Sequence, residues 1–459
     1  MKRVSLILVL ALFSCSKNKD SPPLTSSTAT LRQTTSADAC AAFIHGLPHD
    51  VVRDYVDVPE NPKNPDGPRL KIFYYGRILL GREPVLFING GPGEDSRGDY
   101  RLLKSNAVDP IWNTASVLFF DQRGNGCSSP YPQGNSDEVL ARLRFYGSSG
   151  IVADAEAIRR QLFPGQKWRV IGQSYGGWVA HRYAIQAPEG LTVVASQANV
   201  IDADPLERVT NRIYSQNRVL EEYFKTYPDD RAALTALHAA LTPDKCFPNA
   251  TALPRRCGLG ALNELTGRFP FVPRWTWIHD QINLMVKNGV VDDRSVLDFL
   301  KATSFSIPND PENQKSWAKI VINFYDRNVP EFDRPTCEAI YARLRARGEN
   351  PENYLLHECM GTMQFPTPNS LRGRDARLAG LSAAYGTDHL TIEMLKSSLT
   401  ANANLKFYLY SGQLDTAVPV ENFTAEVAAL GNLLTYRNFL KSGHDGYYTE
   451  HQIALDVLP

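Results

Sequence analysis

Residues 172–176 read Gly-Gln-Ser-Tyr-Gly, the pattern Gly-x-Ser-x-Gly in which a serine sits on a sharp turn. The apolar, β-rich run Trp168–Ile171 precedes the pattern, and a helical pattern follows it from Gly177. Such a turn exposes the serine hydroxyl, and glycines are needed where a side chain would clash with neighbouring backbone. Ser174 is therefore the predicted nucleophile; the alternative is a structural glycine-rich turn.

A serine hydroxyl is a weak nucleophile, so it needs a base that is oriented by a third group. Among the nine histidines, His444 follows the last strand-like run, in Ser-Gly-His-Asp. Asp415 follows the strand-like run Leu405–Tyr410 and opens a loop. Ser174, Asp415 and His444 satisfy the chain order serine, acid, histidine that accompanies this turn. Asp445 is the second candidate for the acid, although its adjacency to His444 disfavours a good side-chain hydrogen bond.

The tetrahedral intermediate of acyl transfer carries an oxyanion, which needs preorganised hydrogen-bond donors. The backbone N–H of Tyr175, the residue after the nucleophile, is one predicted donor. The other is expected from residues 89–93, Asn-Gly-Gly-Pro-Gly, which follow the strand-like run Pro84–Ile88. Within that stretch the N–H of Gly91 is the first choice and that of Gly90 the second. A plain turn is the alternative.

Strand-like and helix-like segments alternate around these residues. Short β-rich runs that end in turn residues occur at Pro84–Ile88, Ser116–Phe120, Trp168–Ile171, Leu191–Ala195, Leu405–Tyr410 and Thr435–Leu440. Between the second and third of these runs, apolar residues recur at helical spacing over Ile151–Leu162. Alternating strands and helices predict an α/β fold with a mostly parallel central sheet flanked by helices.

The chain of 459 residues is long for one compact core. From about residue 201 to 400 the pattern is mostly helical and holds four cysteines. Because surface loops tolerate long insertions, we interpret this segment as a large helical cap inserted before the acid-bearing strand. The predicted divisions are a signal peptide at 1–14, a lipid tether and N-terminal segment at 15–60, a first core segment at 61–200, the cap at 201–400 and a second core segment at 401–459.

The N-terminus has the features of an export signal. Lys2–Arg3 is basic, and Val4–Phe13 is an apolar run too short to span a bilayer of roughly 30 Å as a helix. The run ends in Leu-Phe-Ser-Cys, which resembles a bacterial lipobox with Cys15 as the lipid-bearing residue. An ordinary signal peptide with an incidental cysteine is the alternative.

Residues 16–38 contain no aromatic side chain and are rich in Ser, Thr, Pro and Lys, so they predict a flexible tether. Ser16 resembles the outer-membrane sorting pattern of Gram-negative lipoproteins. The expected location is therefore a lipid anchor, in the outer membrane and facing the periplasm.

Seven cysteines are present, and six remain once Cys15 is set aside. Export places them in an oxidising compartment, where an even set predicts disulfides. Among the many possible connectivities we favour the local pairs Cys246–Cys257 and Cys337–Cys359, which leave Cys40–Cys127. A zinc site is the competing interpretation, disfavoured because no Cys-x-x-Cys spacing occurs.

Composition narrows the range of partners. Lys+Arg and Asp+Glu both count 49, so the charge gives no reason to expect nucleic acid or an acidic membrane surface as a partner. The sequence shows no cofactor-binding glycine fingerprint and no metal motif. We expect no cofactor and no metal, with the membrane contacted only through the lipid anchor.

Three glycine-bearing motifs together resemble the prolyl aminopeptidase and tripeptidyl aminopeptidase family of α/β-hydrolase serine peptidases. They are Asn-Gly-Gly-Pro-Gly at 89–93, Asp-Gln-Arg-Gly-Asn-Gly-Cys-Ser at 121–128 and Gly-Gln-Ser-Tyr-Gly-Gly at 172–177. Asp415 and the Gly-His pair at 443–444 fit the same family. Tyr-Gly-Gly after the serine looks more like the tripeptidyl branch, since the prolyl branch favours Trp there.

The resemblance implies the α/β-hydrolase fold and a Ser-His-Asp acyl-enzyme mechanism. It also implies that Asp-Gln-Arg-Gly at 121–124 braces the active-site entrance, although Arg123 fits a structural salt bridge better. Asn89 stands where the family usually has His, and Asn can likewise donate and accept hydrogen bonds.

The predicted function is a serine aminopeptidase that releases N-terminal residues or short peptides from peptide substrates. Such an enzyme would need a carboxylate that binds the ammonium group of the substrate. Glu358 and Glu94 are the candidates, and each also fits a solvated or salt-bridged surface residue.

Three other functions compete with this prediction. An exported esterase or other acyl hydrolase could use the same triad. A haloalkane dehalogenase or epoxide hydrolase is disfavoured because those relatives carry Asp at the nucleophile position. A non-catalytic binding protein on a hydrolase fold is disfavoured by the presence of all the triad residues.

Overall fold

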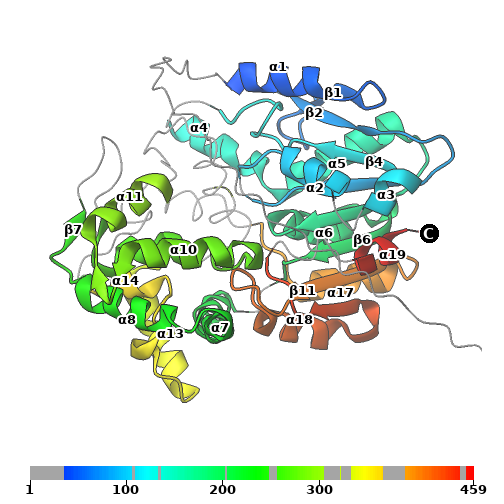
Figure 1. Cartoon of the computed structure of the whole chain (residues 1–459). Helices are drawn as coiled ribbons and strands as arrows, with labels where there is room; N and C mark the ends of the chain where they lie inside the picture. The colour runs from blue at the N-terminus through cyan, green and yellow to red at the C-terminus, as the bar shows by residue number, and fades with distance from the viewer. Residues whose placement is uncertain are drawn as a thin grey trace, which may run out of the picture.

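The protein is described by a computed structural model over residues 36–91, 93–105, 109–132, 136–201, 204–247, 256–303, 321, 332–364, 388–444 and 451–458. An eight-stranded sheet of order β1-β2-β4-β3-β5-β6-β11-β12 organises this part of the chain (Figure 1). Its strands are β1 (Val52–Pro59), β2 (Arg69–Arg77), β3 (Pro84–Ile88), β4 (Ser116–Phe120), β5 (Trp168–Gln173), β6 (Leu191–Gln197), β11 (Lys406–Gly412) and β12 (Thr435–Phe439).

The sheet is parallel from β4 to β12, and only β1 and β2 run antiparallel to their neighbours. Every residue of β3, β4 and β5 is buried. Strands covered on both faces need apolar residues on both faces, which explains the continuous rather than alternating apolar runs. The predicted α/β fold with a mostly parallel sheet is confirmed.

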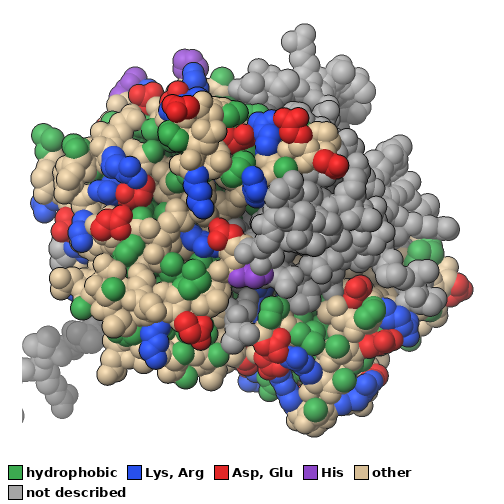
Figure 2. All heavy atoms as spheres, turned by 180° about the vertical axis from the view of Figure 1, so that it is seen from behind, with side chains coloured by type: hydrophobic (Ala, Val, Ile, Leu, Met, Phe, Trp, Pro, Cys, Tyr) green, Lys and Arg blue, Asp and Glu red, His purple; other side chains and the backbone are tan. Residues whose placement is uncertain are grey.

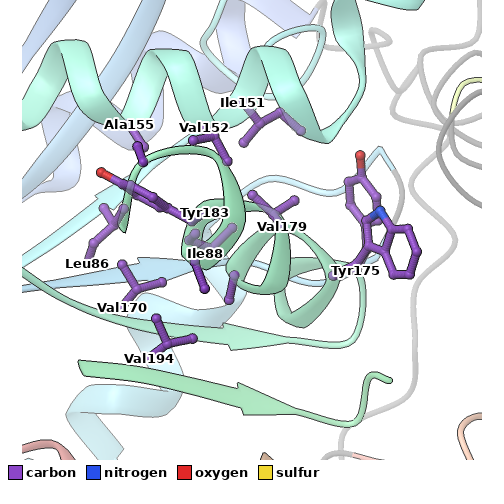
Figure 3. Packing of buried hydrophobic residues seen from close by; sticks show 14 of the residues in the cluster. Leu86, Ile88, Ile151, Val152, Ala155, Val170, Tyr175, Val179, Tyr183 and Val194 are labelled. Carbon is purple, nitrogen blue, oxygen red and sulfur yellow. The ribbon is translucent and has the colours of Figure 1, made fainter. Parts of the chain in front are cut away.

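One face of the sheet is covered by α5 (Ser148–Leu162), α6 (Tyr175–Gln186), α17 (Ile392–Ala401) and α18 (Phe423–Leu430). Figure 3 shows Val179 and Tyr183 of α6 lying between the sheet residues Leu86, Val170 and Val194 and the α5 residues Ile151, Val152 and Ala155. Because α6 is packed on both sides, the turn that precedes it is fixed against the sheet.

The other face is covered by α1 (Ser36–Gly46), α2 (Arg97–Ser105), α3 (Asp109–Thr114) and α19 (His451–Val457). Their apolar residues pack with strand residues such as Phe87 and Phe119 in a second core cluster. The sheet domain is thus three layers, helix on sheet on helix, with α4 (Asp137–Arg142) and short 3₁₀ turns η1 (Leu143–Tyr146), η2 (Pro188–Gly190), η7 (Val420–Asn422) and η8 (Gly431–Leu433) in its connections.

A group of helices lies to one side of the sheet domain and forms the cap, which we define as the described residues between 204 and 364 (Figure 1). Its main elements are α7 (Pro205–Thr226), α8 (Asp230–Ala240), α10 (Trp275–Met285), α11 (Asp293–Thr303), α13 (Arg334–Ala346) and α14 (Cys359–Gln364). Shorter elements are the strands β7 (Cys246–Phe247), β8 (Arg256–Cys257), β9 (Val286–Lys287) and β10 (Val290–Val291), the helix α9 (Asn263–Thr266), and the turns η3 (Gly258–Leu262), η4 (Val272–Arg274) and η6 (Pro351–Asn353). The cap has its own apolar core.

Two predicted boundaries differ from the structure. β1 falls inside segment 15–60 yet pairs along its whole length with β2, so the sheet domain begins before residue 61. All but the last residue of α17 falls inside segment 201–400, yet the helix packs on the sheet-domain core through Leu395 and Leu399. Helical periodicity shows that one face of a helix is buried, but it does not show which part of the protein covers that face. The sequence pattern alone therefore led to the prediction that α17 belongs to the cap.

Disulfides join Cys40 to Cys127, Cys246 to Cys257, and Cys337 to Cys359. These are the predicted pairs. Cys40–Cys127 ties α1 to the loop that follows β4, and Cys337–Cys359 ties α13 to α14 inside the cap.

On the face shown in Figure 2, basic and acidic side chains of the described residues are interspersed, in keeping with the equal counts of the two charges. Over the described ranges, no helix has the length and apolar character needed to cross a bilayer. The predicted signal peptide, Cys15 and most of the tether lie outside the described residues.

Candidate active site

Ser174 lies on a tight turn between β5 and α6, with φ 54° and ψ −116°. The turn is possible because its flanking positions are glycines. A Cβ on Gly172 would lie 2.1 Å from the carbonyl oxygen of Gly176, and a Cβ on Gly176 would lie 2.0 Å from that of Ile88. A positive φ at a non-glycine residue costs of order 1–3 kcal/mol and persists where the surroundings enforce it. The local structure is therefore the exposed serine turn that the motif predicts.

The end of β6 holds this turn in place. The N–H of Ser174 donates to the carbonyl of Gln197 at 2.8 Å. The side-chain amide of Asn199 donates to the carbonyl of Ser174 at 2.5 Å. Sequence reasoning did not single out Asn199; the only signal was a polar residue two positions after the end of a buried strand.

Ser174, His444 and Asp415 form one hydrogen-bonded chain. His444 Nε2 lies 3.0 Å from Ser174 Oγ, and His444 Nδ1 lies 2.8 Å from Asp415 Oδ2. In the tautomer with the proton on Nδ1, His444 donates to Asp415 and its Nε2 accepts from the serine hydroxyl. The alternative acid, Asp445, lies outside the described residues.

The carboxylate of Asp415 is held independently of the histidine. It is fully buried, and its Oδ1 accepts the N–H groups of Ala417 at 2.8 Å and Val418 at 3.0 Å. These two bonds leave Oδ2 for the imidazole. The sequence signal was only the place of Asp415 after a strand; the turn that satisfies Oδ1 had no signal in the sequence.

The predicted oxyanion loop begins at the end of β3, where Ile88 contacts the serine turn. Gly91 has φ 69°, a conformation that favours glycine. A Cβ on Gly90 would lie 2.1 Å from Gln173 Oε1, so the loop passes directly over the residue before Ser174. Tyr175 is the first residue of α6, where backbone N–H groups favour negative charge. The loop and the start of this helix therefore meet at the serine.

Asn89 braces this loop. Its Nδ2 donates to the carbonyl of Glu94 at 2.8 Å and to that of Gly90 at 3.2 Å. Gln122 Nε2 in turn donates to the carbonyl of Asn89 at 2.8 Å. Asparagine at this position thus supplies a donor that spans the loop, and Gln122 is a supporting residue that the sequence indicated only as one member of a motif.

The Asp-Gln-Arg-Gly segment at 121–124 makes buried polar contacts that support the site. Asp121 is buried, which raises the pKa of its carboxyl, and its Oδ1 accepts from both the N–H and the hydroxyl of Ser96. Arg123 is fully buried in a two-bond ion pair with Asp154, at 2.6 and 2.8 Å. Arg123 therefore has the structural role that the sequence favoured.

Glu94 and Glu358, the two acids predicted to bind the substrate ammonium, lie in different surroundings. Glu94 is exposed and lies against the oxyanion loop, where a Cβ on Gly91 would meet its Cγ at 2.7 Å. Glu358 is mostly buried in the cap and is paired with Arg212, Nη2 to Oε1 at 2.5 Å. Glu358 is thus already committed to a cation within the cap, whereas Glu94 lies beside the site.

Within the described ranges, no three His, Cys, Asp or Glu side chains are grouped so as to hold a metal ion. The expectation that the protein needs no cofactor stays a prediction.

Comparison with known proteins first identifies the fold class. Residues 83–277 match the family model described as alpha/beta hydrolase fold. Together with the sheet order and the serine turn, this match shows that the chain has the α/β-hydrolase fold.

Its curated relatives give the finer likeness, which is to prolyl aminopeptidases. The chain is 29% identical to a proline iminopeptidase of Aeromonas sobria, over 46% of this chain and 51% of the relative. It is 27% identical to proline iminopeptidase aneH of Aspergillus aculeatus, over 47% of this chain and 52% of the relative. The chain spans about half the length of these relatives. Among solved structures, proline iminopeptidase of Mycobacterium smegmatis aligns over 88% of this chain and 99% of its own, with 13% identity and a TM-score of 0.41.

Proposed function

We propose that the protein is a serine aminopeptidase that acts through an acyl-enzyme. The observation that carries the proposal is the hydrogen-bonded chain of Ser174, His444 and Asp415, with a glycine-rich loop beside the serine. This is the arrangement that activates a serine hydroxyl toward a carbonyl carbon.

The reaction follows from these contacts. Ser174 Oγ attacks the scissile carbonyl while His444 Nε2 takes its proton, and Asp415 stabilises the imidazolium that forms. The N–H groups of Gly91 and Tyr175 are the proposed donors to the oxyanion. His444 then returns the proton to the leaving amine. Water repeats the sequence to release the acyl group and restore the serine hydroxyl.

An aminopeptidase must also bind the substrate ammonium, and a carboxylate pairs with an ammonium through strong charge-assisted hydrogen bonds. Glu94 is better placed for this role than Glu358, because the Glu94 side chain lies against Gly91 of the oxyanion loop. The relatives named proline iminopeptidase support an amino-terminal substrate. The competing function is an esterase or other acyl hydrolase on the same triad.

Cleavage of aminoacyl p-nitroanilides with free and with N-acetylated amino ends separates these functions. An aminopeptidase should cleave only the free form, because acetylation removes the charge and leaves the acid without its partner. Glu94→Gln should reduce this preference, and Glu358→Gln serves as the comparison. Equal cleavage of the two substrates would remove the aminopeptidase proposal and leave the acyl hydrolase.

A further inference from the structure

The backbone of His444 is bonded to the cap. Its N–H donates to the carbonyl oxygen of Pro270 at 2.7 Å. The preceding Gly443 is packed so tightly that a Cβ there would lie 2.3 Å from the same oxygen. The ring of Phe271 contacts the imidazole edge to face, with centroids 5.7 Å apart. The histidine is thus held on this side by two consecutive cap residues.

The cap turn that makes these contacts is itself anchored. Phe269 is 1% exposed, and its ring packs 5.2 Å from that of Tyr223 in α7. The carbonyl of Phe269 accepts from Trp275 Nε1 at 3.2 Å. The N–H of Phe271 donates to the carbonyl of Arg268 at 3.2 Å. Because the turn is fixed to the cap core, the Pro270 oxygen moves with the cap.

The acid loop has a second contact with the cap. Arg218 of α7 donates through Nη1 to the carbonyl of Gln413 at 3.0 Å and through Nε to Glu421 at 2.9 Å. The side chain of Leu414 packs against the apolar core of the cap. Gln413 and Leu414 directly precede Asp415, so the cap supports the acid as well as the base.

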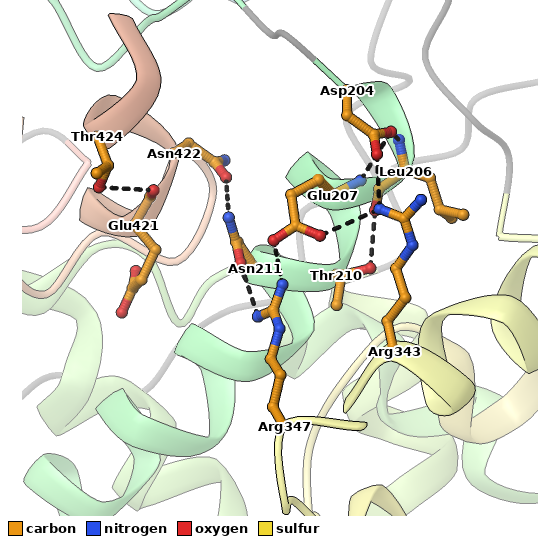
Figure 4. Close-up of polar contacts among 10 residues, drawn as sticks. All are labelled: Asp204, Leu206, Glu207, Thr210, Asn211, Arg343, Arg347, Glu421, Asn422 and Thr424. Atoms are coloured by element: carbon orange, nitrogen blue, oxygen red, sulfur yellow. Dashed lines mark hydrogen bonds and ion pairs between the residues drawn. The ribbon is translucent and has the colours of Figure 1, made fainter. Parts of the chain in front are cut away.

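Polar contacts along α7 reinforce the junction (Figure 4). Asn211 donates to Asn422 Oδ1 at 2.9 Å, and Arg347 of the cap donates to Asn211 Oδ1 at 2.9 Å. Arg343 joins Asp204 at 2.7 Å near the start of the helix. These bonds tie α7 both to the rest of the cap and to the sheet domain.

We propose that the cap helps to hold the Ser174-His444-Asp415 triad in position. Phe271, the Pro270 carbonyl and Arg218 are the positioning groups. This inference rests on the proposed function of the triad. The sheet domain holds one side of the histidine backbone, through the bond from Gln173 Nε2 to the His444 carbonyl at 3.0 Å. The cap holds the other side. Displacing the turn from His444 therefore lowers the rate of acylation itself, not only the binding of substrate.

Gly443→Ala is the direct test, since the added methyl must push the histidine loop and the Pro270 turn apart. Labelling of Ser174 by a small fluorophosphonate reports triad geometry without need of a peptide-binding site. We expect kcat and the labelling rate to fall together, by about 10²-fold for a displacement of about 1 Å, with KM changed much less. Gly46→Ala is the matched control, because a Cβ on Gly46 meets no atom within 4 Å.

Arg218→Ala is a second, independent variant that removes no apolar core. It should lower kcat and the labelling rate in the folded protein, with a changed pH profile of kcat because the Asp415–His444 bond is altered. Arg231→Ala is its control, since Arg231 forms an exposed ion pair with Glu221 within the cap. A purely structural role would lower the melting temperature of Arg218→Ala but leave its pH profile unchanged.

The outcomes separate the inference from the function on which it rests. If the wild-type protein is not labelled, the proposed hydrolase function fails. If the wild type is labelled and folded Arg218→Ala and Gly443→Ala react at the wild-type rate, the triad is correct and the positioning role of the cap is wrong. If Gly443→Ala does not fold, Arg218→Ala alone decides.

Discussion

Asp415 uses its two carboxylate oxygens for different tasks. Oδ1 is held by two backbone N–H groups of its own loop, and Oδ2 faces His444. In the proposed mechanism, a carboxylate oriented in this way needs no rearrangement when the imidazole becomes charged. At the residue scale, these contacts therefore support the proposed role of Asp415.

Replacing Ser174 by alanine removes the proposed nucleophile and one hydrogen bond to His444. Because the triad acts as a unit, kcat should fall by roughly 10⁴-fold or more. The fold should persist, since the turn is held by backbone and Asn199 contacts that do not involve the hydroxyl. Steady-state kinetics with circular dichroism and a thermal melt check both effects. A folded variant with near-normal activity would disprove the assignment.

Arg123 offers a test of structure against function. Arg123→Ala leaves Asp154 buried without its cation, which should cost about 3–5 kcal/mol in the free energy of unfolding. Removing the exposed partner of Glu338 with Arg334→Ala should cost about 0–1 kcal/mol. Urea denaturation measures both values. If Arg123→Ala kept its stability but lost activity, the residue would act at the active site instead.

At the scale of elements, the serine turn depends on how closely β3, β5 and α6 approach. Gly176 is the contact point, with the carbonyl of Ile88 where a Cβ would be. The helices and the sheet that sandwich this point cannot separate without exposing the core shown in Figure 3. The glycine is therefore required by packing.

Gly176→Ala should destabilise the protein by at least about 1–3 kcal/mol, the usual cost of overpacking, and should also abolish activity. Gly98→Ala, in α2, is the matched control because its Cβ meets open space. That control should be stabilised by about 0.5–1 kcal/mol through helix propensity. Thermal melts of the two variants compare them directly. Equal stability of the two would contradict the packing argument.

Sequence patterns predicted some of these elements correctly but not how all of them pack. The strand ends before the serine turn, the oxyanion loop and Asp415 were predictable because buried strands and turn residues follow short-range rules. β1 and α17 were assigned to the wrong units because their partners, β2 and the α6 side of the sheet, are set by tertiary packing. The contacts of Asn199, Gln122 and Pro270 join residues far apart in the sequence, and no local pattern encodes such distances.

On the scale of the whole molecule, the chain places its triad residues in two separated segments, with the cap between them. The contacts of Pro270 and Arg218 bring that insertion back onto the histidine and acid loops. This arrangement fits the resemblance, which is carried by the core motifs.

We also propose that the chain is exported and held at a membrane by lipid on Cys15, followed by a flexible tether. The three disulfides within the described residues fit an oxidising compartment. The tether contains none of the triad residues, so anchoring should affect location and not catalysis.

Cys15→Ser should therefore move the protein from the membrane fraction to the soluble fraction of the cell envelope. Its specific activity should equal that of the wild type, because the proposed site is built from Ser174, Asp415 and His444 in the folded domain. Cell fractionation with immunoblotting, and activity per amount of protein in each fraction, measure the two effects. Cys40→Ser is the informative comparison, since it breaks the Cys40–Cys127 disulfide and should reduce stability without changing membrane association. Retention of Cys15→Ser in membranes would mean that something other than lipid on this cysteine anchors the chain.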